Sequence, residues 1–252
     1  MAIALRKPEE IEKLRAANKV VAGALALLRE ATRPGMSLKE LDAMAEDYIR
    51  SQGARPSFKG LYGFPASVCT SLNEVIIHGI PDDYKLQEGD IIGYDIGSEL
   101  GGYFGDAAIT VGVGTVSEED KALMACAEDS LYFAVETIRE GMRFKELSQK
   151  IEQFILERGF VPLRGFCGHG IGKKPHEEPE IPNYLEGNNP KAGPKIKNGM
   201  VFCIEPMICN KEGKAIIRDN GWDVVSSDGL RGSHYEHTVA VIHGRAEILS
   251  KI

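Results

Sequence analysis

An internal repeat organises this chain of 252 residues. The segment GMSLKEL at 35–41 returns as GMRFKEL at 141–147, and Gly53 returns at the same offset as Gly159. Self-similarity over such a distance indicates that one structural unit occurs twice in the chain. The alternative is that unrelated amphipathic segments look alike, but further echoes follow in the same order and favour a duplication.

The repeat continues into apolar segments that each carry an acid. GDIIGYD, which ends at Asp95, is echoed by GMVFCIE, which ends at Glu205. GDAAITVGVG, which contains Asp106, is echoed by YEHTVAVIHG, which contains Glu236. Each half therefore offers strands that bear two carboxylates.

Two helices precede the strands in each half. Apolar residues recur with a helical period from Pro8 to Arg29, and Ser37 with Glu40 forms a capping box that opens a second helix ending near Gln52. We predict an α+β fold in which helices cover an antiparallel β-sheet. The expected organisation is a single domain, 1–252, with related halves at about 1–115 and 116–252.

The stretch GYDIGSELGGYFGD at 93–106 predicts a β-hairpin with an acid on each arm. Folding it about Leu100 and Gly101 places Asp95 directly opposite Asp106, and strand alternation points both side chains to one face. Two carboxylates at this spacing require a shared proton or a cation between them. The alternative is an exposed hairpin whose acids never meet.

A two-fold arrangement of the halves would bring Asp95 and Asp106 to face Glu205 and Glu236. Four buried carboxylates without a cation would cost several kcal/mol each, and a divalent metal removes that cost. His169, which has glycines on both sides, can join them from the loop between the repeats. One imidazole among carboxylates suits Mn, Fe, Co or Zn better than Ca or Mg.

The remaining polar candidates have less specific patterns. His78 and His176 could orient a substrate amide or stabilise a tetrahedral intermediate, and each could instead cap a loop. Glu177 and Glu178 are expected to be exposed loop acids, and Cys203 a small buried hydrophobe. His234 and His237 are expected to point away from the face of Glu236 and to be structural, and His243 to be a turn residue.

Composition excludes several function classes. The formal net charge is -7 and the basic residues are dispersed, so neither a nucleic-acid footprint nor a membrane-surface patch is visible. The chain starts without a signal-like segment and has no apolar stretch of membrane-spanning length. Its five cysteines form no C-x-x-C pair, which favours a reducing compartment. We expect a soluble cytoplasmic protein and a monomer.

With these residues in place, the chain resembles the type I methionine aminopeptidases of the bacterial kind, which have the pita-bread fold. The resemblance covers essentially all residues. Its motifs are NEVIIHGIP with His78, YDIG with Asp95, GYFGDAA with Asp106, FCGHGIGKKPHEEPEIPNY with His169 and His176, FCIEPM with Glu205, and YEHT with Glu236.

The resemblance implies two divalent ions, of Co, Mn, Fe or Zn. By similarity, Asp95 would chelate one ion, His169 and Glu205 the other, and Asp106 and Glu236 would bridge them. A metal-bound water or hydroxide would attack the carbonyl of an N-terminal methionine. In that reaction Glu205 would carry the proton, while His78 and His176 would contact the scissile amide and its developing oxyanion.

The resemblance also implies a pocket for the methionine side chain, lined or neighboured by Phe58, Leu61, Phe64, Cys69 and Trp222. Family members often have asparagine at the position of Gly93, tyrosines at those of Leu61 and Phe64, and a small residue or cysteine at that of Phe58. The expected partners are N-terminal methionine peptides and nascent chains, with the ribosome as a further candidate.

Two alternatives remain at this point. A proline-directed peptidase of the same fold, such as an aminopeptidase P or a prolidase, would share the metal acids but normally carries an additional N-terminal domain. A non-catalytic pita-bread protein that binds protein or RNA would have lost metal ligands and gained basic extensions. This sequence shows neither of those changes.

Overall fold

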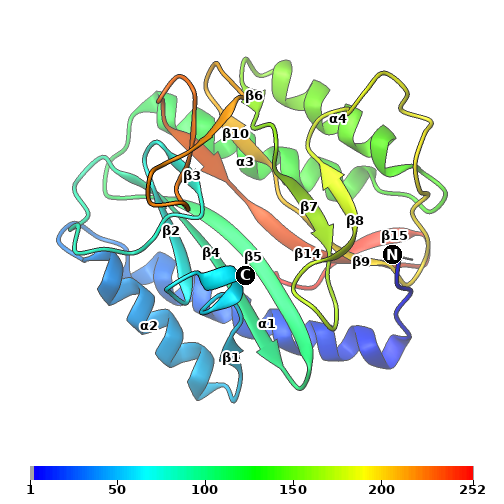
Figure 1. Cartoon of the computed structure of the whole chain (residues 1–252), viewed down its shortest axis with the longest axis horizontal. Coiled ribbons are helices and arrows are strands. Elements are labelled where there is room, and N and C mark those ends of the chain that lie inside the picture. The colour runs from blue at the N-terminus through cyan, green and yellow to red at the C-terminus, as the bar shows by residue number, and fades with distance from the viewer. Residues whose placement is uncertain (1–2, 252) are drawn as a thin grey trace.

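The computed structural model describes residues 3–251 (Figure 1). The helices are α1 Pro8–Ala31, α2 Leu38–Ser51, α3 Glu118–Thr137 and α4 Phe144–Leu156, with a short 3-10 turn at Leu61–Gly63. The strands are β1 Arg55–Pro56, β2 Val68–Leu72, β3 Val75–Ile77, β4 Ile91–Leu100, β5 Tyr103–Gly112, β6 Val161–Pro162, β7 Cys167–Gly170, β8 Glu177–Pro182, β9 Val201–Ile204, β10 Met207–Cys209, β11 Ala215–Ile217, β12 Val224–Ser226, β13 Gly232–His234, β14 Glu236–Ile242 and β15 Arg245–Ile248.

The helices begin where the sequence predicts. Pro8 occupies the first turn of α1, and the Lys7 amide donates to the Glu10 side chain, 3.1 Å away. The capping box of α2 is present in full: the Ser37 amide donates to Glu40 Oε2 at 2.8 Å, and the Glu40 amide donates to Ser37 Oγ at 3.2 Å. Within the described residues, no helix is both long and apolar enough to cross a bilayer.

One large sheet forms the centre of the molecule. Its strands run in the order β1-β4-β5-β14-β9-β7-β8, with β2 added to β4 and β15 to β14. Strands β5 and β14 pair antiparallel in the middle, β4 flanks one of them and β9 the other. The strands that carry Asp95, Asp106 and Glu236, and the strand that Glu205 follows, are therefore adjacent (Figure 1).

Each pair of helices packs on the strands that follow it in the chain. Leu25 and Leu41 of α1 and α2 lie in one apolar core with Ile92 and Ile109 of β4 and β5. A second core joins α3 and α4 to β9 and β14, through Leu123, Leu147, Phe202 and Val239 among others. Burial of these apolar faces is the main force that holds the helices against the sheet.

The register of the β4–β5 hairpin corrects one prediction. The turn consists of Gly101 and Gly102, both with positive φ, so Asp95 pairs with Ala108 and Asp106 pairs with Gly97. Direct opposition of the two acids is therefore wrong. Moving the turn centre by one residue shifts the cross-strand partner of each acid by two residues. Because side chains alternate with a period of two, both acids still point to the same face of the sheet. The two acids consequently lie diagonally on the same side of the sheet.

Candidate metal centre

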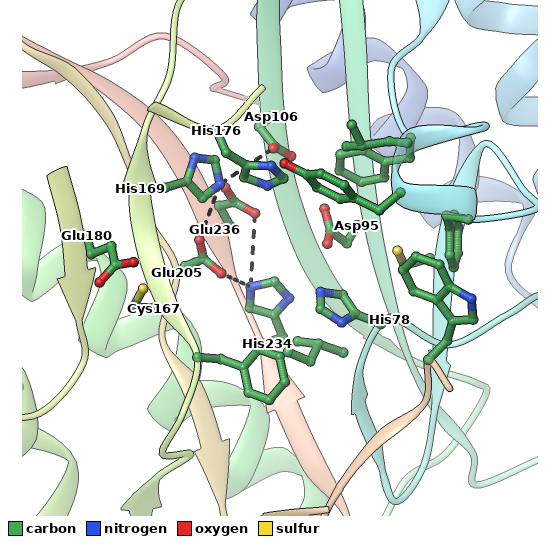
Figure 2. Close-up of a pocket in the computed structure, with 18 of the residues that line it drawn as sticks. His78, Asp95, Asp106, Cys167, His169, His176, Glu180, Glu205, His234 and Glu236 are labelled. Atoms are coloured by element: carbon green, nitrogen blue, oxygen red, sulfur yellow. Dashed lines mark ion pairs between the residues drawn. The ribbon is translucent and has the colours of Figure 1, made fainter. Parts of the chain in front are cut away.

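A pocket of about 480 Å³ opens over the face of the central sheet. Its wall contains every site residue predicted from the sequence: Phe58, Leu61, Phe64, Cys69, His78, Asp95, Asp106, His169, His176, Glu205, Trp222 and Glu236. The acids and His169 gather on one side, and most of the aromatic side chains lie on the other, where His78 meets Trp222 (Figure 2).

The acids come from the middle strands of the sheet. Asp95 lies on β4, Asp106 on β5 and Glu236 on β14, while Glu205 follows β9 directly. His169 on β7 joins them: its Nε2 lies 3.5 Å from Glu205 Oε1 and 3.9 Å from Asp106 Oδ2. The structure therefore brings residues from both repeats to one place.

Backbone contacts fix the positions of these acids. The Asp106 amide donates to Oδ1 of the buried Asn18 on α1, 3.2 Å away, and the Thr238 hydroxyl donates to the Asp106 carbonyl at 2.7 Å. Asn183 Nδ2 donates to the Glu205 carbonyl at 2.8 Å. These bonds involve only the backbone groups of Asp106 and Glu205. Their carboxylates are therefore not used in holding the strands and are free to face the pocket.

The electrostatics of the cluster favour a bound cation. Burial raises the pKa of Asp95 to about 7, and burial with neighbouring carboxylates raises the pKa values of Asp106, Glu205 and Glu236 well above their usual range. Among the described residues, Asp95 Oδ1, Asp106 Oδ1 and Glu236 Oε1 are buried without a hydrogen-bond partner. Buried carboxylate oxygens without a hydrogen-bond partner are costly, and a bound cation would satisfy them.

His169 has the protonation state that a metal ligand needs. Burial lowers its pKa to about 3, so the imidazole is neutral at physiological pH. Its Nδ1 lies 3.0 Å from the Gly170 carbonyl, which accepts a hydrogen bond from Nδ1–H and leaves Nε2 free to face the acids.

The donor atoms form two sets that share one residue. One ligand atom each from Asp106, His169, Cys203 and Glu236 lies within 4.8 Å of the others, and the same holds for Glu205, His234 and Glu236. Nitrogen and carboxylate donors at this spacing fit divalent transition metals. Cys203 is fully buried, as expected, and burial raises its thiol pKa well above the usual range. It therefore remains a neutral thiol.

Two further histidines border the cluster. The His176 ring lies 4.4 Å from that of His169 and stacks on Tyr62 at 5.9 Å. His78 has a positive φ of 60° and meets the edge of Phe166 at 5.5 Å. Burial lowers the pKa of His78 to about 4, so this ring is neutral. Both rings are placed where they can contact a substrate in the pocket.

The apolar side of the pocket is a small cluster of its own. Phe58, Phe64 and Cys69 are buried, and Leu61 and Trp222 pack against them. The rings of Phe64 and Trp222 meet edge to face at 5.0 Å. An unbranched apolar side chain next to the acids would be enclosed by this cluster.

His234 is a pocket residue that the sequence analysis missed. Its Nε2 lies 3.8 Å from Glu205 Oε2 and 4.0 Å from Glu236 Oε2, so the expectation that it points away is wrong. The signal was available, because residues two apart on extended chain share a face. His237, one residue from Glu236, does turn away, with Nδ1 2.9 Å from Ser250 Oγ, and His243 lies in a turn as expected.

Glu177 also differs from its prediction. It begins β8 and lies in the pocket wall, and its side chain is only 17% exposed because it pairs with Arg6. Glu178 also lies on β8 and is exposed. A partner far away in the sequence gives no local signal, so this contact could not be anticipated.

Comparison with known proteins decides the family. The family model described as metallopeptidase family M24 matches residues 12–243. The chain belongs to metallopeptidase family M24. Proteins of this M24 family use divalent metal, in agreement with the donor sets described above.

Within the M24 family, the chain belongs with the methionine aminopeptidases. It is 62% identical to the methionine aminopeptidase of Helicobacter pylori strain ATCC 700392 / 26695, over 100% of both chains. The crystal structure of methionine aminopeptidase from Thermotoga maritima matches with a TM-score of 0.96 and 35% identity, again over 100% of both chains. The predicted pita-bread fold and the predicted hydrolase class are confirmed.

The M24 comparison also bears on the proline-directed alternative. The prolidase from Pyrococcus furiosus matches with a TM-score of 0.80 and 25% identity, over 98% of this chain but 65% of the prolidase. The match to the methionine aminopeptidases is closer in sequence, in fold and in length. It therefore favours the methionine aminopeptidase interpretation over the alternative.

Proposed function

We propose that this chain removes the N-terminal methionine from peptides and nascent proteins at a centre of two divalent metal ions. The observation that carries the proposal is the pair of donor sets that share Glu236 beside an apolar pocket. A cluster of metal-binding side chains next to a pocket for one unbranched apolar side chain suits the removal of a single methionine.

Five residues would hold the ions, which we expect to be Co, Mn, Fe or Zn. Asp95 would serve one ion, His169 and Glu205 the other, and Asp106 and Glu236 would lie between them. When bound, such ions lower the pKa of a water molecule and polarise a substrate carbonyl. The buried carboxylates with raised pKa values fit this role, because cations would replace the protons that they otherwise retain.

The side chains around the cluster would supply the remaining chemistry. Glu205 lines the pocket and has a raised pKa, which suits a group that takes a proton and returns it to the leaving amine. His78 and His176 would donate hydrogen bonds to the scissile amide and to the oxygen on which charge develops. Hydrogen bonds of this kind strengthen as that charge forms.

The apolar cluster would bind the methionine side chain. Phe58, Leu61, Phe64, Cys69 and Trp222 would enclose it. The thioether is flexible and polarisable, and it packs well against aromatic rings.

We also propose how the protein is organised in the cell. Residues 1–252 would act as one catalytic domain of two related halves, about 1–115 and 116–252, and as a monomer in the cytoplasm. There the partners would be nascent chains, with the ribosome as the place of encounter.

Peptide hydrolysis tests the proposal directly. The purified protein loaded with Mn²⁺ or Co²⁺ should release methionine from a Met-Gly-x peptide and leave an x-Pro peptide intact. Cleavage of the x-Pro peptide alone would replace the proposal with the proline-directed alternative. Cleavage of neither peptide would support the non-catalytic one.

A further inference from the structure

His234 lies against the metal centre without a partner for its inner nitrogen. The side chain is buried, and among residues 3–251 Nε2 has no hydrogen-bond partner. Its distances of 3.8 Å to Glu205 Oε2 and 4.0 Å to Glu236 Oε2 are too long for hydrogen bonds. Two ligands on one ion lie at most about 4.4 Å apart, because each metal–ligand bond is about 2.0–2.2 Å long, so one cation could bind this nitrogen together with either glutamate oxygen.

The backbone holds this ring in place independently of the acids. The His234 amide donates to Thr110 Oγ1 at 3.1 Å, and the same hydroxyl donates to the His234 carbonyl at 2.8 Å. His234 also pairs with Met207, two residues beyond Glu205. Figure 2 shows the ring directed toward the two glutamates, opposite the side from which His169 approaches.

We infer that His234 is a second imidazole ligand of the metal centre and binds the cation on the side formed by Glu205 and Glu236. His169 approaches the same glutamate from its other side, with Nε2 3.5 Å from Glu205 Oε1, so both imidazoles would serve the ion that Glu205 holds. The inference rests on the proposed metal-dependent function. It assigns two nitrogen donors to the metal centre, which favours borderline ions such as Co²⁺, Zn²⁺ or Fe²⁺ over Mg²⁺.

A positioning role is the competing explanation. In that case His234 would only orient Glu205, and the centre would contain a single imidazole ligand, from His169. The two explanations differ in the number of coordinated histidines, which can be counted without measuring activity.

Proton NMR of the Co²⁺-loaded protein provides the count, because each coordinated imidazole gives a strongly shifted ring N–H signal. We expect two such signals in the wild type, one in His234→Gln and one in His169→Gln. Titration calorimetry with Co²⁺ should show one binding event weakened at least about tenfold in His234→Gln. His243→Gln changes a histidine in a turn outside the pocket and should keep both signals.

A single shifted signal in the wild type that survives in His234→Gln and disappears in His169→Gln would overturn the inference and leave the proposed function intact. Absence of Co²⁺ binding to the wild type would overturn both. Circular dichroism establishes that the variants are folded, and the count in the wild type decides the question even if His234→Gln does not fold.

Discussion

Arg6 and Glu177 form an ion pair that joins the segment before α1 to the wall of the pocket. The other oxygen of the Glu177 carboxylate accepts hydrogen bonds from the amides of Lys173 and Lys174, at 2.9 and 3.2 Å. The Arg6 amide donates to the Gly199 carbonyl at 2.6 Å. Because Glu177 follows His176 directly, this pair fixes the segment that presents His176 to the pocket.

Removing the arginine should therefore affect both stability and catalysis. In Arg6→Met the Glu177 carboxylate keeps its two amide donors but loses its cation, in a site where the two side chains are 9% and 17% exposed. We expect a loss of about 2 kcal/mol in unfolding free energy, below the roughly 3–5 kcal/mol of a fully buried pair, because the Glu177 carboxylate keeps its amide donors. We also expect kcat to fall about tenfold because His176 is less well placed.

Urea denaturation and steady-state kinetics measure these two effects. Lys173→Met is the matched control, since it removes an exposed pair with Glu10 from the same segment and should cost less than about 1 kcal/mol. Equal losses in the two variants would show that Arg6 has no special role.

Asp106 would lie between the two ions. Neutralising it should stabilise the metal-free protein but impair the metal-loaded one. Asp106→Asn removes a buried carboxyl that is itself destabilised by burial and by neighbouring carboxylates, and that raises the pKa of Glu205. The metal-free variant should therefore melt at a higher temperature than metal-free wild type. The same variant should lose metal binding, and its turnover should fall by more than about a hundredfold.

Calorimetric melting with and without Mn²⁺, together with peptide hydrolysis, checks both signs. Glu236→Gln should behave in the same way. Asp83→Asn, which changes an exposed acid paired with Lys39, should alter neither quantity. Near-normal turnover in Asp106→Asn would show that the carboxylate does not hold a metal.

The stability of the metal-free protein should fall as pH rises above about 6.5. Asp95, with its pKa raised to about 7, and the other three acids retain protons in the folded state that the unfolded chain has already released. Folded-state pKa values above the unfolded ones make stability decrease with pH, by about 1.4 kcal/mol per pH unit for each proton retained.

Below pH 6.5 the buried histidines oppose this trend. The pKa values of His78 and His169 are lowered to about 4 and about 3, so these rings remain neutral in the fold while the unfolded chain takes up protons. Their contribution to stability is therefore lost as pH falls. Urea unfolding at pH 6.5 and 8.5, with and without Zn²⁺, tests the prediction. An unfolding free energy of the metal-free protein that is the same at both pH values would contradict it.

Phe58 should limit the size of the side chain that the pocket accepts. A Cβ on Gly97 would lie 2.5 Å from the Phe58 ring, so this ring lies directly on the backbone of β4, two residues from Asp95. Phe58→Ala should enlarge the pocket at a stability cost of about 3 kcal/mol. We expect the ratio of kcat/KM for Leu-Gly-x to that for Met-Gly-x to rise about tenfold or more.

An unchanged ratio in Phe58→Ala would place this ring outside the specificity pocket. Val68→Ala is a suitable control, because it truncates a buried side chain of the neighbouring strand β2 that lies in the α1–α2 core and not in the pocket wall. It should lower stability without changing the preference for methionine.

Patterns local in sequence predicted much of this structure. The helical periods, the Ser37 capping box and the echoed acids specify two helical pairs and the strands that carry the cluster. The turn of the β4–β5 hairpin was harder to place, because Gly101 and Gly102 are adjacent and each tolerates positive φ. Only cross-strand pairing distinguishes the two possible registers.

Contacts between distant segments could not be read from the sequence. Arg6 and Glu177 are 171 positions apart, and no local sequence pattern at either residue indicates its partner. His234 is different, since its spacing from Glu236 was sufficient to place both on one face. What the spacing did not give was the pairing of β13 with β10, which brings His234 next to Glu205 as well.

The sheet order has a consequence for biosynthesis. Strand β14 lies between β5 and β9, although the chain reaches residues 236–242 only after both neighbours have been made. Until β14 inserts, β5 and β9 each present an unpaired edge that can join a strand of another molecule. A growing or truncated chain is therefore expected to be prone to aggregation. Cations can bind between the acids, and so stabilise the sheet, only after β14 has paired with both neighbours.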